Sequence, residues 1–134
     1  AIHAGECDIA IGNTYYIGAM MDNDDQRPWA EAVRVEFPTF ANGAGTHLNV
    51  SGIAMTRSAP NRAAAEKLME YLVSPSAQAI YAELNHEYPV LAGAEMSAIV
   101  ASWGTPVWDT QNLTDLAKLR PAALRIMEEV GYDN

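Results

Sequence analysis

The number and order of extended segments constrain the fold of this chain more than any other feature. Three runs have the composition of β-strands, namely Cys7 to Ile11, Ala32 to Phe37 and His47 to Met55. Helical patterns separate these runs without forming a complete set of strand, helix and strand. Because unpaired strand edges are unstable, the implied sheet needs further strands. We therefore predict an α/β fold to which this chain contributes one part of a mixed sheet flanked by helices.

Apolar residues at helical spacing predict the remaining elements. Thr14 is expected to cap a first helix that contains two tyrosines and two methionines. Further helices are expected at 61–73, 77–84, 97–103 and 113–119, and a last one from Pro121 to a C-cap at Gly131. This last helix should bury a stripe formed by Ala123, Leu124, Met127 and Val130.

Charge and cysteine content narrow the classes of partner. The chain has 134 residues, a formal net charge of −9 and a single cysteine. A surface this acidic repels nucleic acid and anionic membranes, whereas a cationic ligand is electrostatically favoured. A lone cysteine excludes an internal disulfide, and Cys7, placed in an apolar run, is expected to be a buried structural thiol.

The common catalytic patterns do not occur in the sequence. It contains no glycine-rich phosphate loop, no Gly-x-Ser-x-Gly elbow and no HExxH motif, so we do not expect an enzyme. His3, His47 and His86 are isolated and lie at no metal-ligand spacing. We interpret them as surface or hydrogen-bonded side chains and not as ligands.

An adjacent tyrosine pair follows the first predicted strand in the run Gly12-Asn13-Thr14-Tyr15-Tyr16. Open α/β sheets hold their ligands at the carboxyl ends of strands, which is where this pair is predicted to lie. On residue type alone, such a pair is more often a core or interface aromatic cluster than a metal site. Neighbouring helical side chains diverge by about 100°, so shared ligation requires an irregular turn, which Gly12-Asn13 permits.

Four segments resemble the periplasmic ferric-ion-binding proteins of bacterial iron ABC importers. They occur in the family's order and are residues 5–16, 45–52, 81–90 and 128–133. The resemblance therefore extends over nearly the whole chain. It implies a two-lobed periplasmic-binding-protein fold with hinge strands between the lobes, of which this chain is the C-terminal part.

The resemblance also implies how the chain is divided between the two lobes. Residues 1–32 are expected in the C-terminal lobe, 33–44 in a hinge crossing, 45–92 in the N-terminal lobe and 93–134 in the C-terminal lobe again. The strands that the sheet lacks are then expected in sequence that precedes this chain.

By the same resemblance, Tyr15 and Tyr16 are expected to bind Fe³⁺ as phenolates. Asn13 is expected to hold a phosphate or carbonate anion that occupies other coordination positions. The remaining ligands are expected from N-terminal sequence. The chemistry agrees, because Fe³⁺ is a hard cation that prefers anionic oxygen donors.

The implied function is capture of ferric iron in the periplasm and delivery to the membrane permease of an ABC importer. Two alternatives remain open at this point. The first is a binding protein for an organic solute such as a polyamine, thiamine or a phosphonate, and the second is an enzyme on the same scaffold. We also expect the isolated chain to self-associate through uncovered edges.

Overall fold

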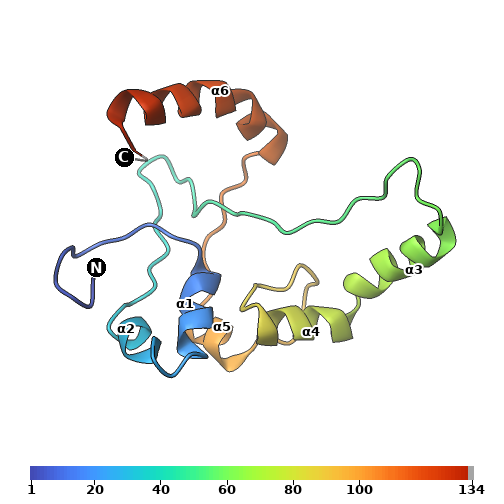
Figure 1. Cartoon of the computed structure of the whole chain (residues 1–134), viewed down its shortest axis with the longest axis horizontal. Helices are drawn as coiled ribbons and strands as arrows, with labels where there is room; N and C mark the ends of the chain where they lie inside the picture. Colours follow the sequence, from blue (N-terminus) through green and yellow to red (C-terminus); the bar gives the residue numbers. More distant parts are fainter. Residues whose placement is uncertain (133–134) are drawn as a thin grey trace. The chain divides into compact units, whose positions relative to one another are not determined.

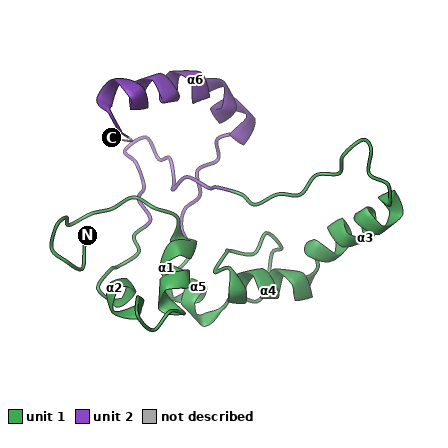
Figure 2. Cartoon of the chain, viewed as in Figure 1, with its two compact units in different colours: residues 1–36, 50–105 green, residues 37–49, 106–134 purple. Residues whose placement is uncertain are grey.

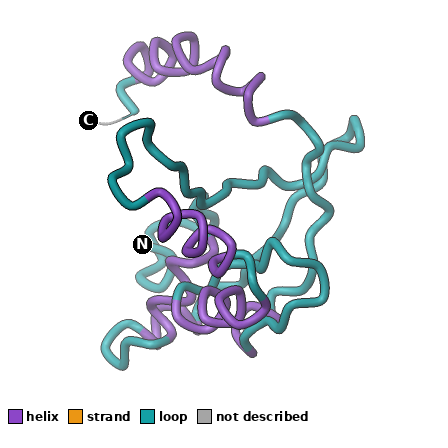
Figure 3. Tube along the Cα trace, turned by 90° about the vertical axis from the view of Figure 1, so that its right-hand side faces the viewer, coloured by secondary structure: helices purple, strands orange, loops and turns teal. Residues whose placement is uncertain are grey.

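All regular elements in residues 1–132, which the computed structural model describes, are α-helices (Figures 1 and 3). They are α1 (Thr14–Met21), α2 (Arg27–Glu31), α3 (Arg62–Leu72), α4 (Pro75–Leu84), α5 (Ala98–Ser102) and α6 (Leu113–Val130). The helices predicted from apolar spacing are present. The sequence analysis missed α2, a short helix with proline in its first turn.

The chain divides into two compact units (Figure 2). The first comprises residues 1–36 and 50–105 and contains α1 to α5. The second comprises residues 37–49 and 106–134 and contains α6. The tyrosine pair therefore belongs to the first unit.

The three predicted strands are not formed in the described residues. Their runs are loops, and β pairing is limited to one isolated parallel bridge between Thr46 and Trp108. The Thr46 N–H donates to the Val107 carbonyl at 2.7 Å, and the Asp109 N–H donates to the Thr46 carbonyl at 2.8 Å. A strand exists only where a neighbouring strand accepts and donates its backbone hydrogen bonds. Residues 7–11 and 32–37 have the composition of strands but face no partner strand in this part of the chain.

Helix α1 begins one residue earlier than predicted. Asn13 is the N-cap, with extended φ of −80° and ψ of 143°, and Thr14 is already helical. The prediction that Thr14 caps this helix is therefore wrong. At α4, by contrast, the Ser74 hydroxyl accepts from the Ala77 N–H at 3.4 Å, and Pro75 takes the first helical position, so this helix starts two residues before the predicted 77.

Helix α6 is continuous where two helices were predicted. Pro121 lies inside it and does not start a new helix. Proline removes one backbone N–H donor, but the helix continues on both sides of it. At the N-terminus of α6, the side chain of the N-cap Asn112 accepts from the Thr114 N–H at 2.9 Å. Gly131 ends the helix in the left-handed conformation at φ of 63°, as predicted.

The apolar stripe expected to be buried on α6 is exposed. Leu124 is 46% exposed and Val130 is 70% exposed. Amphipathic helices bury such a stripe against another element, and the second compact unit contains no other helix. The stripe was identified correctly as apolar, but its burial requires a surface that this unit does not supply.

The core of the described chain is small. Its buried apolar residues are Ala30, Ala77, Ala82 and Val100, whereas many larger apolar side chains are exposed. The accessible surface is 10511 Å², whereas a compact monomer of this mass exposes about 6,900 Å². This chain therefore leaves uncovered a large surface that a longer protein can bury. None of the helices in the described residues has the length and apolar character needed to cross a bilayer.

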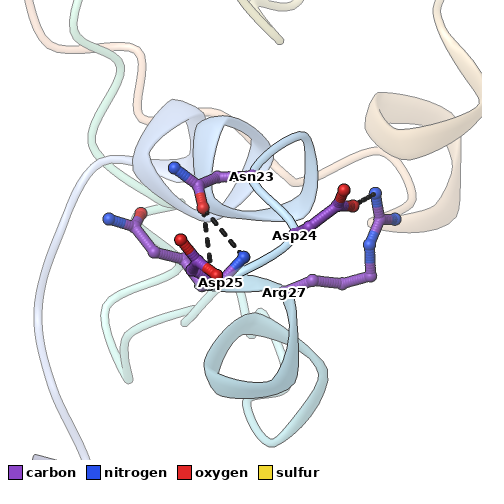
Figure 4. A network of polar contacts seen from close by, with 5 residues as sticks. Asn23, Asp24, Asp25 and Arg27 are labelled. Atoms are coloured by element: carbon purple, nitrogen blue, oxygen red, sulfur yellow. Dashed lines mark hydrogen bonds and ion pairs between the residues drawn. The ribbon is translucent and has the colours of Figure 1, made fainter.

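A side-chain hydrogen-bond network shapes the turn between α1 and α2 (Figure 4). The Asn23 side-chain oxygen accepts from the N–H groups of Asp25 at 3.0 Å and Gln26 at 3.3 Å. Arg27 pairs with Asp24 at 3.5 Å, but this pair is exposed to solvent and contributes little. The Asn23 turn reverses the chain, so that α2 packs against α1.

The loop after α4 is fixed by a buried glutamine. Gln78 is 6% exposed, and its amide nitrogen donates to the Leu72 carbonyl at 2.7 Å. Its amide oxygen accepts from the Val90 N–H at 2.8 Å. One side chain thus joins the end of α3, the start of α4 and the loop that contains His86.

We predict that Gln78→Ala lowers the free energy of unfolding by about 1–3 kcal/mol, because it leaves backbone groups of Leu72 and Val90 unpaired. Gln111→Ala, at an exposed position, is the matched control and should change little. Urea denaturation of both variants measures the difference. Equal effects would show that the Gln78 bonds do not stabilise the loop.

Candidate metal site

The three residues predicted for the site lie together at the start of α1. The Asn13 side chain makes no capping hydrogen bond to a backbone N–H of α1. Its amide nitrogen instead donates to the Tyr15 phenol oxygen at 3.0 Å. A capping asparagine usually accepts from the first-turn N–H groups. Here its side chain is directed at the phenol and leaves that turn without a side-chain cap.

The two tyrosine rings converge although they are neighbours in a regular helix. Their centroids are 4.6 Å apart and their planes are inclined by 58°. Tyr15 is half-buried, and Tyr16 is 57% exposed. The rings therefore meet within a helix, whereas their joint ligation of one ion stays a prediction. Side-chain rotation compensates for the divergence of the backbone positions.

The Tyr16 phenol influences the protonation of Tyr15. The pKa of Tyr15 is raised above its ordinary value, first because its hydroxyl is hydrogen-bonded with Tyr16, and then by desolvation and repulsion from Tyr16. The bond from Asn13 acts in the opposite direction, because an amide donor stabilises the phenolate. Without a cation Tyr15 therefore retains its proton, and a bound cation must displace it.

Glu87 adds a negative charge that the sequence analysis did not connect with the site. Its carboxylate contributes to the raised pKa of Tyr15. The side chain is half-buried in the loop that follows α4, far from Tyr15 in sequence. No spacing or motif links the two residues, so only the folded chain reveals that they lie close enough to interact.

The other candidate side chains lie outside this cluster. His3 and His47 are exposed, whereas His86 is buried and hydrogen-bonded, in line with the prediction for the three histidines. Cys7 is half-buried and not fully buried as expected. In residues 1–132, no three His, Cys, Asp or Glu side chains are grouped as a metal site. The candidate cation donors at this cluster are the two phenols.

Comparison with known proteins shows which family this chain resembles. Residues 1–106 match the family model described as bacterial extracellular solute-binding protein. The chain is 45% identical to iron uptake protein A1 of Synechocystis sp. in an alignment 134 residues long that covers 98% of this chain and 37% of the relative. Iron uptake protein A2 of the same organism is 40% identical, over 98% of this chain and 39% of the relative.

Solved structures show the same relationship. Ferric iron-binding protein A of Mannheimia haemolytica, in an open conformation, is 50% identical with a TM-score of 0.89, over 98% of this chain and 41% of that one. The Trichodesmium protein IdiA (FutA), in complex with iron and citrate ligands, is 38% identical with a TM-score of 0.89, over 98% of this chain and 42% of that one.

These similarities confirm the resemblance inferred from the sequence. This chain spans about two fifths of the length of the proteins that it matches. Its backbone corresponds to part of the fold of ferric-binding proteins, which confirms the coarser fold prediction. The mixed sheet itself remains a prediction for a longer protein.

We predict that the Tyr15 phenol titrates above the ordinary tyrosine pKa and that two substitutions move it in opposite directions. Tyr16→Phe should lower the pKa of Tyr15, because it removes the largest cause of the increase. Asn13→Ala should raise it further, because it removes a donor to the phenolate. NMR titration of ring-labelled tyrosine in the metal-free protein measures both shifts. Shifts of the same sign in the two variants would contradict this account.

Proposed function

We propose, since this chain belongs to the family of bacterial extracellular solute-binding proteins, that it is the C-terminal part of a protein that captures ferric iron. In this proposal the protein acts in the periplasm and delivers the ion to the membrane permease of an ABC importer. The observation that carries the proposal is the convergence of two phenols, with an amide donor, at the start of α1.

The donor chemistry supports a hard trivalent cation as the ligand. Fe³⁺ prefers anionic oxygen donors, and two phenolates cancel two of its three charges. The rings of Tyr15 and Tyr16 lie in contact with their centroids 4.6 Å apart, and the Asn13 amide donates to the Tyr15 oxygen. Binding replaces phenol protons by the cation, so the affinity falls at acid pH. A hinged cleft can then release the ion by opening.

Asn13 and the first turn of α1 are proposed to hold an accompanying anion. The N-terminus of a helix favours negative charge, and this one has no side-chain cap. Phosphate or carbonate is the anion that we propose. The similar Trichodesmium protein is described in complex with iron and citrate ligands. We propose that the anion supplies oxygen donors that the two phenols do not.

The other iron ligands are proposed to come from N-terminal sequence outside this chain. We propose that residues 1–32 and 93–134 belong to the C-terminal lobe, 33–44 to a hinge crossing and 45–92 to the N-terminal lobe. These are lobes of the longer protein, and they differ from the two compact units of this chain.

The alternatives receive less support than ferric iron. A polyamine, thiamine or phosphonate site has no need of a phenolate pair. The relatives are named as iron uptake and ferric-binding proteins, which favours binding over an enzyme on the same scaffold. A visible phenolate-to-iron charge-transfer band distinguishes ferric iron from an organic solute, because an organic solute produces no such band.

We predict that Tyr15→Phe and Tyr16→Phe, each made in the full-length protein, weaken this band and lower the ferric affinity by more than about tenfold. Each change removes one anionic oxygen and keeps the ring. Tyr71→Phe, on α3, is the matched control and should behave as wild type. Competition with citrate, followed by absorbance, measures the affinity. Retention of the parent's colour and affinity by both single variants would sink the proposed site.

We predict that the isolated 134-residue chain binds ferric iron much more weakly than the full-length protein does. Two phenolates and one amide cannot supply the approximately six donors that a ferric ion accepts, and each lost factor of ten in affinity corresponds to about 1.4 kcal/mol. Its exposed apolar side chains should also promote self-association. Titration with ferric citrate during sedimentation tests both expectations. A monomer that binds one ion tightly would show that the site is complete in this chain.

A further inference from the structure

His86 occupies a backbone position that few side chains adopt without compensation. Its φ is 55°, and it is the one non-glycine residue with positive φ among residues 1–132. Histidine in this region carries conformational strain that surrounding contacts must offset. The side chain is only 3% exposed, so the compensation comes from packing and hydrogen bonding inside the first compact unit.

Two contacts join the His86 ring to one face of α1. A Cβ atom placed on Gly18 would overlap ring atoms of His86, so the ring lies directly on the backbone of the helix. The ring Nε2 donates to the Asp22 carboxylate at 2.8 Å, and Asp22 is the C-cap of α1. Residues 18 and 22 are one helical turn apart on the same face. The ring thus fixes both the rotation and the axial position of α1.

The remaining ring nitrogen of His86 suits a fixed packing role. Its Nδ1 is buried and has no hydrogen-bond partner within residues 1–132. An unpaired buried polar atom is unfavourable, so the position is retained at an energetic cost. The contacts that stabilise the ring in this position are those with α1, namely the packing on Gly18 and the hydrogen bond to Asp22.

Helix α1 transmits this restraint to the tyrosines. Gly18 lies within one helical turn of both Tyr15 and Tyr16. A helix this short moves as one body, so a shift at Gly18 displaces both phenol oxygens. Glu87, which acts on the pKa of Tyr15, is bonded directly to His86 in the chain. The same loop therefore restrains the helix and sets the charge near its tyrosines.

We infer that His86 is a positioning residue for the tyrosine pair, acting through Gly18 and Asp22. Its ring sets the orientation in which α1 presents the two phenol oxygens to a ferric ion. This inference rests on the proposed function, because it assigns a consequence to the phenol geometry. It adds a requirement, a glycine at position 18, that the donor chemistry alone does not impose.

The test uses variants of the full-length protein loaded with ferric iron. Gly18→Ala introduces the overlap with the ring, whereas Gly52→Ala, where an added Cβ meets nothing within 4 Å, is the matched control. His86→Asn tolerates the positive φ but cannot reach Asp22, and His86→Gln restores an amide donor near the position of Nε2. The readouts are the wavelength of the charge-transfer band, the affinity in competition with citrate, and the Tm of the metal-free protein.

We expect Gly18→Ala and His86→Asn to shift the band and to weaken ferric binding by about 10–100-fold, the range for residues that orient metal ligands. Gly52→Ala should match wild type, and His86→Gln should recover part of the loss. If Gly18→Ala does not fold, the two His86 variants decide the question. A lower Tm with an unchanged band and affinity in those variants would make the role purely structural and overturn the inference.

The failure of this inference differs from the failure of the proposed function. A wild-type protein without a charge-transfer band overturns both. A wild-type band that is lost in Tyr15→Phe but unaffected by His86→Asn and Gly18→Ala overturns the positioning role alone.

Discussion

The contact between the His86 ring and Gly18 organises the part of this chain that carries its chemistry. Helix α1 is eight residues long, too short to be stable by itself. It is held by α2 on one side and by the loop after α4, and that loop is in turn fixed by Gln78. The tyrosine pair at the start of α1 thus depends on buried contacts from residues far away in sequence.

The arrangement of the phenols joins two requirements that usually conflict. A ferric site must bring negative oxygens close together, which is unfavourable without the cation. Here the pKa of Tyr15 is raised beside Tyr16, so Tyr15 keeps its proton until a cation binds. The amide of Asn13 favours the ionised state of Tyr15, and Glu87 opposes it. The cluster can therefore form before the ion arrives.

The uncovered surface of the chain has the same origin as its missing sheet. Strand-like runs such as residues 7–11 contain Ile9 and Ile11, which are 84% and 101% exposed. Backbone groups and apolar side chains of such runs are satisfied together when a neighbouring strand is added. A chain that spans about two fifths of its relatives leaves these surfaces for other segments to cover.

The sequence by itself determined the helices with strong apolar spacing, the C-cap at Gly131 and the family. It also identified Asn13, Tyr15 and Tyr16 as one candidate cluster, because these signals are local or depend on motif order. The tertiary structure alone decided that Glu87 acts on Tyr15. It also decided that His86 lies on Gly18. The physical reason is that these residues lie far apart along the chain. Packing and charge act through space, so they produce no periodic sequence pattern from which such contacts can be predicted.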